Sequence, residues 1–226
     1  MSERADSLKA EGFRVSFQLR DSIDVAGELL DVAAAENADI LLVGSRSHNR
    51  VHDFFLGSVA KDVLRKASLP VLLERIEPTQ EGTGVVCEAV CKQKLTSVLL
   101  ATDFSDQARR AEEAALNLMN AADQVCFLSI IEPSGRDGRD QEDLKEAKAK
   151  LAALRARCAG STDKINTVAE IHHAADRIVR AAEDMGATLI VIGKHGRDWR
   201  PQSIIGGLAE SICLTAKRPV LVVPGT

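Results

Sequence analysis

Two segments of the chain align with each other without a gap. Residues 38–76, which begin ADILLVGS, overlie residues 187–225, which begin ATLIVIGK, so that Gly44 falls on Gly193 at an offset of 149 residues. The match continues upstream through a helical pattern in each copy (23–39 and 172–188). Because self-similarity at a fixed offset is the signature of a repeated structural unit, we expect one α/β unit to occur twice in the 226-residue chain.

The second copy completes a regular alternation of strand and helix patterns. Short, nearly continuous apolar runs predict strands buried on both faces of a parallel sheet, at 94–102, 125–131, 165–171, 189–193 and 219–223. Helical spacing predicts helices over 105–122, 140–160, 174–185 and 208–217, with Ser105 or Asp106 as the first N-cap and Gly160 ending the second helix. Such a sheet carries helices on both faces and binds ligands beyond the carboxyl ends of its strands.

Composition and charge exclude several classes of protein. A hydrophobic content of 45% is enough to bury a sizeable core, and a net charge of −4 without a basic stripe argues against nucleic-acid binding. No apolar run approaches the roughly 18 residues of a membrane span, and the amino terminus lacks a signal-peptide core. We therefore expect a cytoplasmic protein without a membrane or nucleic-acid partner, whose five cysteines are reduced.

The sequence offers neither a metal site nor a catalytic constellation. Cys87 and Cys91 have helix-face spacing, but the residues around them supply no further ligands for a tetrahedral site. His172 and His173 precede Asp176, but consecutive side chains do not normally face one shared site. We find no Ser-His-Asp, Cys-His or paired-carboxylate pattern, so strong catalysis is not expected.

A glycine-containing loop, GKHGRDWRPQSIIGG (193–207), joins a predicted strand to a predicted helix. The amides at the start of a helix lack partners, and the helix dipole favours an anion there. Glycines allow close approach of the backbone and positive φ angles. The loop is not a P-loop, because no Gly-Lys-Ser/Thr closes it, and GxGxxG is absent. It is therefore either an anion-binding loop or a tight turn.

Three separated motifs together resemble the universal stress protein family. They are the spacing Gly193-x2-Gly196-x9-Gly206, the ATDFS segment (101–105) after a strand, and the closing RPVLVVP (218–224). The family signature is glycine, two residues, glycine, nine residues, glycine, then Ser or Thr. The resemblance implies a Rossmann-like parallel sheet of order 3-2-1-4-5 with helices on both faces, pairing of domains through the last strand, and in many members a bound ATP.

The resemblance also assigns residues to a nucleotide site. It places Asp103 and Ala101 near the adenosine and the peptide of Ile131 at the adenine edge. Gly193 and Gly196 would surround the ribose and the first phosphates. The amides of Gly206 and Gly207 would contact the outer phosphates, with Lys194 and His195 as further phosphate contacts. Alternatively, Asp103 caps the following helix, and Lys194 and His195 are solvated. Gly207 replaces the family's Ser or Thr, which removes a hydroxyl donor worth about 0.5–1.5 kcal/mol.

The first copy departs further from the family pattern. It retains Gly44-x2-Ser47-x9-Gly57-Ser58, but the sequence begins where the family's long second helix would be ending, so the first two strands are missing. FRVSFQL (13–19) then lacks a neighbour in the expected strand order. Three arrangements remain open: a truncated chain, pairing of 13–19 directly beside ILLVG (40–44), or a gap filled by another chain.

These observations predict an organisation and a function. We expect a carboxyl-terminal part of a first domain in 1–76, a linker in 77–93 and a complete domain in 94–226, so that the fold is duplicated with its first copy incomplete. The second domain is expected to bind ATP or ADP, with or without Mg²⁺, and occupancy to modulate conformation or association in a stress response. The alternative is a protein-interaction module that binds no nucleotide. Any ATP hydrolysis is expected to be slow, and exposed edges of the first copy predict a homodimer and an unidentified protein partner.

Overall fold

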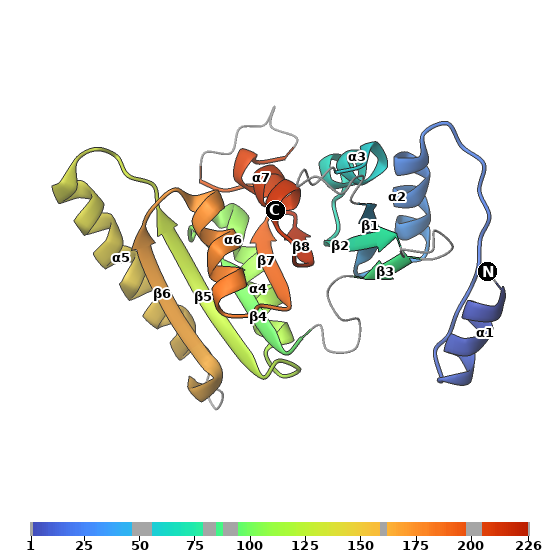
Figure 1. The fold of residues 1–226 in the computed structure, drawn as a ribbon, viewed down its shortest axis with the longest axis horizontal. Coiled ribbons are helices and arrows are strands. Elements are labelled where there is room, and N and C mark those ends of the chain that lie inside the picture. The colour runs from blue at the N-terminus through green and yellow to red at the C-terminus, as the bar shows by residue number, and fades with distance from the viewer. Residues whose placement is uncertain are drawn as a thin grey trace.

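The computed structural model describes residues 2–46, 56–78, 85–87, 95–158, 162–197 and 205–225 (Figure 1). Its helices are α1 (Ser2–Ala10), α2 (Val25–Ala35), α3 (Ser58–Lys66), α4 (Arg109–Leu118), α5 (Asp137–Ala156), α6 (Ala174–Asp184) and α7 (Gly207–Thr215), with 3-10 turns η1 (Asp106–Ala108) and η2 (Thr162–Lys164). Its strands are β1 (Leu41–Arg46), β2 (Val71–Pro78), β3 (Val85–Cys87), β4 (Ser97–Ala101), β5 (Gln124–Ile131), β6 (Ile165–Ile171), β7 (Leu189–Gly193) and β8 (Val220–Val223).

One sheet runs through both halves of the chain. Its strand order is β1-β2-β8-β7-β4-β5-β6, and β3 pairs antiparallel with β2 at the side. From β6 to β8 all neighbours are parallel. Numbered within the second half, these five strands have the order 3-2-1-4-5. The fold class predicted from the sequence is therefore confirmed, with a second copy that is complete and a first copy that contributes β1 and β2.

The two halves meet where β2 pairs antiparallel with β8. Leu72 lies opposite Leu221, its own counterpart at the offset of 149 residues, and the flanking pairs are Val71 with Val222 and Leu73 with Val220. This register is symmetric about Leu72 and Leu221, as a local twofold axis requires. The pairing of domains through the last strand, which the family resemblance implies, is therefore observed between β2 and β8.

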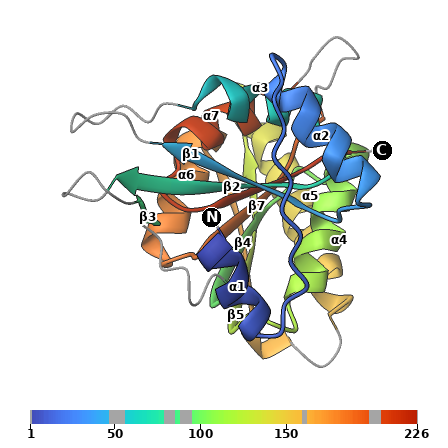
Figure 2. The ribbon, with the colours of Figure 1, turned by 90° about the vertical axis from the view of Figure 1, so that its right-hand side faces the viewer.

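Helices cover both faces of the sheet (Figures 1 and 2). One apolar cluster contains side chains of α2, α3, α6 and α7, and a second contains side chains of α4 and α5. Leu99 of β4 belongs to the first cluster and Leu100 to the second, because successive strand residues point to opposite faces. All residues of β4 are buried, which explains why its sequence is an uninterrupted apolar run.

Helix boundaries follow from local capping. Ser105 accepts a hydrogen bond from the amide of Ala108 and caps η1, so the predicted cap at Ser105 is confirmed. Asp24 caps α2 by accepting from the amide of Gly27 at 3.0 Å. The bounds of α2 and α6 differ by the same offset as the repeat, so the duplication extends to whole helices.

The segment 13–19 is not a strand in the described structure. Residues 13–20 have no regular secondary structure, and β1 pairs with β2 alone. In the second half, β4 and β5 lie between β7 and β6. In the first half, no described strand lies on the other side of β1. The arrangement with 13–19 paired to ILLVG is therefore not adopted.

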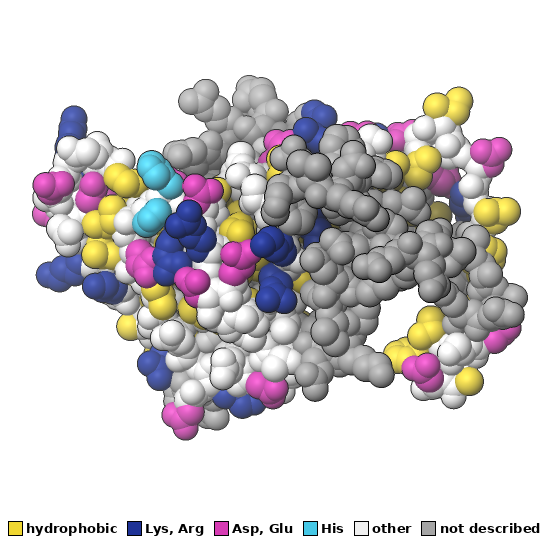
Figure 3. Space-filling view, in the orientation of Figure 1, with side chains coloured by type: hydrophobic (Ala, Val, Ile, Leu, Met, Phe, Trp, Pro, Cys, Tyr) yellow, Lys and Arg dark blue, Asp and Glu magenta, His cyan; other side chains and the backbone are white. Residues whose placement is uncertain are grey.

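Some structure appears where the sequence indicated none. Helix α1 was not predicted, and β2 extends to Pro78 before β3 returns antiparallel over 85–87, within the expected linker. Figure 3 shows Lys and Arg side chains interspersed with Asp and Glu over the visible face of the second half. None of the helices in the described ranges has the length and apolar character of a membrane span.

Candidate functional site

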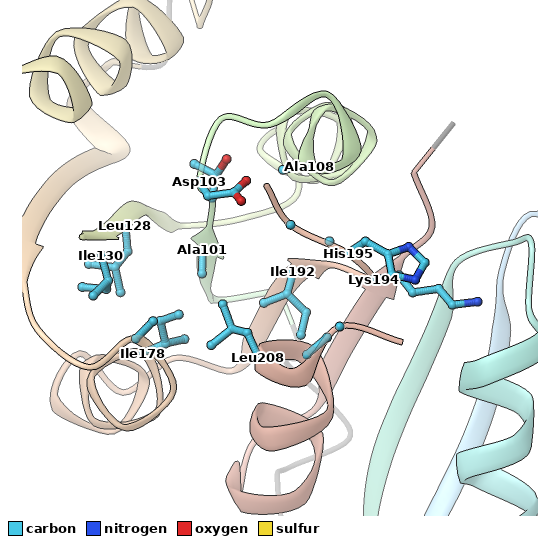
Figure 4. A pocket seen from close by; sticks show the side chains of 16 residues that line it. Ala101, Asp103, Ala108, Leu128, Ile130, Ile178, Ile192, Lys194, His195 and Leu208 are labelled. Carbon is cyan, nitrogen blue, oxygen red and sulfur yellow. The ribbon is translucent and has the colours of Figure 1, made fainter. Parts of the chain in front are cut away.

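A cleft opens at the carboxyl ends of β4, β5 and β7, beside the amino terminus of α7 (Figure 4). It consists of an inner cavity of about 80 Å³ and an outer cavity of about 500 Å³. Both are lined by Asp103, His195, Gly196 and Gly206, so they adjoin each other. The sequence predicted a ligand site at this edge of the sheet.

The inner cavity has mainly apolar walls. They come from three strands and two helices, through Ala101, Leu128, Ile130, Ile178, Ile192 and Leu208. Apolar walls disfavour a bare charge and favour an uncharged ring. Ala101, Asp103, Gly193, Gly196 and Gly206, all predicted site residues, line this cavity.

Asp103 joins the end of β4 to the glycine loop. Its Oδ1 accepts hydrogen bonds from the amide and hydroxyl of Ser105, at 3.0 and 2.6 Å. Its Oδ2 accepts from the amide of Arg197 at 2.6 Å, and its carbonyl accepts from Nη2 of Arg197 at 2.9 Å. The carboxylate therefore supports the start of η1 while it also lines the cleft, so the two alternatives for Asp103 are compatible.

A buried network that the sequence did not reveal supports the Asp103 turn. Phe104 has a positive φ of 59°, which is uncommon for a side chain other than glycine. Its amide donates to Oγ1 of Thr102 at 3.0 Å, and this hydroxyl donates to Oε1 of Glu112 at 2.6 Å. Glu112 is 8% exposed, and burial raises the pKa of its carboxyl group. The sequence shows Thr102 within the ATDFS segment, but it does not show that Glu112 on α4 is the hydrogen-bond partner of this threonine.

Close packing explains two of the loop glycines. A Cβ at Gly193 would lie 2.9 Å from the carbonyl oxygen of His195, and one at Gly196 would lie 2.8 Å from Oδ2 of Asp103. The close approach predicted for these glycines was to a bound anion and stays a prediction. The positive φ angles are not found at the described loop glycines; among the described glycines they occur at Gly12, Gly135 and Gly186. The loop needs glycine because a side chain would displace Asp103 or the loop's own backbone.

The start of α7 provides backbone donors at the cleft, where Gly207 and Leu208 line the outer cavity and Ala209 lines the inner one. The amide of Gly206 donates to the carbonyl of Lys194 at 2.9 Å, so it is already engaged. The first amide bonded within the helix is that of Glu210, which donates to Gly206. Within the described residues, no hydrogen bond engages the amides of Gly207, Leu208 and Ala209, as expected for the first donors of a helix. Gly207 thus matches the predicted anion contact better than Gly206 does.

Lys194 does not occupy the position predicted for a phosphate contact. Its Nζ donates to the carbonyls of Arg65 at 2.7 Å and Ala67 at 2.9 Å, at the end of α3. Figure 4 shows the side chain extending away from the cleft. The residue is 7% exposed, and burial lowers the pKa of its ammonium group. Lys194 still lines the inner cavity, whereas His195 lines both cavities.

Charges of both signs surround the outer cavity. Helix α5 contributes Asp143, Glu146 and Lys150, and the loops contribute Glu132 and Arg197. Lys150 lies 2.6 Å from Glu146 and 5.8 Å from the centre of the Phe104 ring. The carboxylates therefore partly balance the basic groups that line the cavity.

Ile131 lines the outer cavity as well, and its carbonyl accepts a hydrogen bond from the amide of His172 at 2.9 Å.

The side chains that the structure describes include neither a cluster of metal ligands nor a cysteine whose thiol is exposed. No group of three or more His, Cys, Asp or Glu side chains among them is placed to hold a metal ion. Cys126 and Cys213 are buried free thiols, and burial raises their pKa values to about 11 and about 12. The side chains of Cys87, Cys91 and Trp199 lie outside what the structure describes.

Comparison with known proteins agrees with the fold. A universal stress protein from Mycolicibacterium smegmatis is 26% identical over 227 residues, which cover 97% of this chain and 72% of that protein. Universal stress protein MJ0577 of Methanocaldococcus jannaschii is 26% identical over 154 residues, or 56% of this chain and 93% of its own. The crystal structure of a universal stress protein from Archaeoglobus fulgidus aligns with a TM-score of 0.73 at 22% identity, over 99% of this chain and 76% of its own.

The family comparison covers both halves separately. The model of the universal stress protein family matches residues 2–75 and again residues 94–224. The two matched segments correspond to the two copies seen in the sheet. The chain therefore belongs to the universal stress protein family, in a tandem form.

Proposed function

We propose that the cleft binds an adenine nucleotide, ATP or ADP, and that occupancy regulates conformation or association in a stress response. The observation that carries this proposal is the meeting of three features at one sheet edge. An apolar cavity, the carboxylate of Asp103 and the amides at the start of α7, which no hydrogen bond among the described residues engages, adjoin each other. A base, a ribose and a phosphate require these three environments in this sequence along one ligand.

Each feature has a role in the proposal. The base enters the apolar inner cavity beside Ala101, with the peptide of Ile131 at its edge. Asp103 accepts a hydrogen bond from a ribose hydroxyl, and Gly193 and Gly196 leave room for the sugar and the first phosphate. The amides of Gly207, Leu208 and Ala209 receive the outer phosphates, with His195 and Arg197 nearby.

The outer cavity also explains why we expect modest affinity. Gly207 offers no hydroxyl, and Lys194 is engaged at α3. The carboxylates of Asp143 and Glu146 line the same cavity and repel a polyphosphate. Mg²⁺ bound to the phosphates would offset this repulsion. We therefore expect binding to be stronger with Mg²⁺ than in its absence.

Release of a bound ligand on denaturation is the first experiment. Purified protein is denatured, and the supernatant is chromatographed for adenine nucleotides. Asp103→Asn is the informative variant, because it removes the negative charge but keeps a side chain of the same size with an oxygen that can still accept hydrogen bonds. We expect nucleotide from the wild-type protein and less from the variant. No released nucleotide, together with no change in melting temperature at millimolar ATP and Mg²⁺, would support the interaction-module alternative.

A second candidate function, association of two copies, rests on exposed apolar surface. Of the eleven large hydrophobic side chains described as exposed, nine lie between Leu8 and Leu42, including Phe13, Phe17 and Leu42. Figure 3 shows hydrophobic side chains on the part of the surface formed by the first half. Exposed apolar patches and strand edges are sites of association. We propose a homodimer, and light scattering that shows only monomer at micromolar concentration would exclude it.

A further inference from the structure

Two buried cationic side chains, one from each half of the molecule, bind backbone carbonyls of the other half. Lys194, after β7, donates to the carbonyls of Arg65 and Ala67 at the end of α3. Arg75, on β2, donates through Nε to the carbonyl of Ala216 at 2.8 Å and through Nη2 to that of Cys213, at the end of α7. Ala67 and Ala216 are counterparts in the repeat, so each half caps the same helix of the other.

These contacts are strong for physical reasons. The last carbonyls of a helix lack partners within the helix, and its dipole places negative charge there. Arg75 is 4% exposed and Lys194 is 7% exposed. If the halves separated slightly, little water could therefore reach these cations to replace their hydrogen bonds to the helix carbonyls. Removing the partners of a buried charge is strongly destabilising. The two cations therefore resist relative movement of the halves.

Lys194 also belongs to the glycine loop. Its carbonyl accepts from the amide of Gly206 at 2.9 Å, and its own amide donates to the carbonyl of Val223 at 2.7 Å. Helix α7 begins next to Gly206, at the cleft, and ends next to Ala216, at the Arg75 contact. The loop and both ends of α7 are thus tied to the first half.

We infer that the docking of the first half positions the ligand site of the second half, with Lys194 and Arg75 as positioning residues whose charged groups bind the helix ends and not the ligand. This inference rests on the proposed nucleotide site. A ligand that contacts the start of α7 and the loop then favours the docked arrangement. Because coupling free energies are reciprocal, docking strengthens binding by the same factor as binding strengthens docking.

A surface ion pair provides a matched control for this inference. Nζ of Lys61 on α3 lies 2.6 Å from Oε1 of Glu210 on α7, and both side chains are partly exposed. Lys61→Met therefore removes a different cationic contact between the two halves, one that also involves α3. It leaves the Lys194 contacts and the glycine loop intact. Exposed pairs of this kind contribute little to stability.

The first experiment uses no ligand. Hydrogen exchange at the amide of Gly206, which donates to Lys194, is measured in the wild-type full chain, in Lys194→Met and in Lys61→Met. We expect exchange to be faster in Lys194→Met and unchanged in Lys61→Met. Equal exchange rates in all three proteins would overturn the inference. If Lys194→Met does not fold, Arg75→Lys replaces it. It keeps the charge, but its side chain is shorter than the guanidinium group that now reaches the carbonyls of Ala216 and Cys213, so faster exchange at Gly206 is again expected.

The second experiment adds ADP with Mg²⁺. We expect the affinity of Lys194→Met for ADP to fall about fivefold or more, a typical allosteric coupling, while Lys61→Met stays close to wild type. ADP should also slow exchange at the amide of Ala67 in the wild-type protein but not in Lys194→Met. A loss of stability in Lys194→Met with unchanged affinity would contradict the inference. If the wild type binds no ADP, the proposed function fails, while exchange at Gly206 still decides whether the halves and the loop are coupled.

Discussion

Replacing Gly207 by serine restores the hydroxyl that the family signature carries at this position. A Cβ at Gly207 meets no atom within 4 Å, so the side chain enters without a clash. A hydrogen bond from the hydroxyl to a phosphate contributes about 1.5 kcal/mol, the lower end for a charged partner. We therefore expect Gly207→Ser to lower the dissociation constant for ADP by about tenfold.

The matched control for this variant is Gly207→Ala. Both substitutions add a Cβ and raise the helix propensity at the start of α7, but only serine adds a donor. Dissociation constants for the three proteins are measured by calorimetric titration with ADP and Mg²⁺. Serine should improve binding while alanine stays near wild type. Equal affinities for the serine and alanine variants would show that no phosphate lies at this helix start, and the proposed ligand pose would be wrong.

Three other predictions address the cleft. Gly196→Ala places a Cβ 2.8 Å from Oδ2 of Asp103, so we expect a lower melting temperature. Titration with ATP should show at least a tenfold loss of affinity, or about 1.4 kcal/mol. An unchanged melting temperature and affinity would refute the packing argument. Burial raises the folded-state pKa of Glu112 above its ordinary 4.5, so folding binds a proton and stability should fall as pH rises from 4.5 through the raised pKa. Urea unfolding should show that Glu112→Gln removes this component, and an identical pH profile would count against it. ATP at about 100 times its dissociation constant should raise the melting temperature by roughly 5–10 °C and change the fluorescence of Trp199; neither change would occur if the loop bound nothing.

Apolar patterning made much of the fold predictable. The uninterrupted run of β4 and the apolar run of β8 specify strands buried on both faces, and the repeat placed β2 opposite β8. The ATDFS segment and the loop glycines placed the cleft at the correct sheet edge. These features depend on periodicity and on order along the chain, which a sequence displays directly.

Long-range polar contacts were not predictable in this way. Lys194 binds carbonyls 129 and 127 residues away, and nothing in its local sequence indicates the end of α3 as its partner. The alternation of apolar and polar residues in 13–19 was also not enough to predict whether this segment is a strand. A strand needs a paired neighbour, and no described strand lies beside this segment. The support of the Asp103 turn by Glu112 depends on burial, which only the packed helix determines.

Calorimetric titration of the nucleotide-free wild-type protein with ATP and Mg²⁺ tests the central claim most directly. The residues that line the cleft all belong to the second half, and the described residues of the first half contain no counterparts of β4 and β5. We therefore predict saturable binding of one ATP per chain, weakened by Asp103→Asn. An absence of binding at millimolar ATP, or saturation at two ATP per chain, would contradict the account.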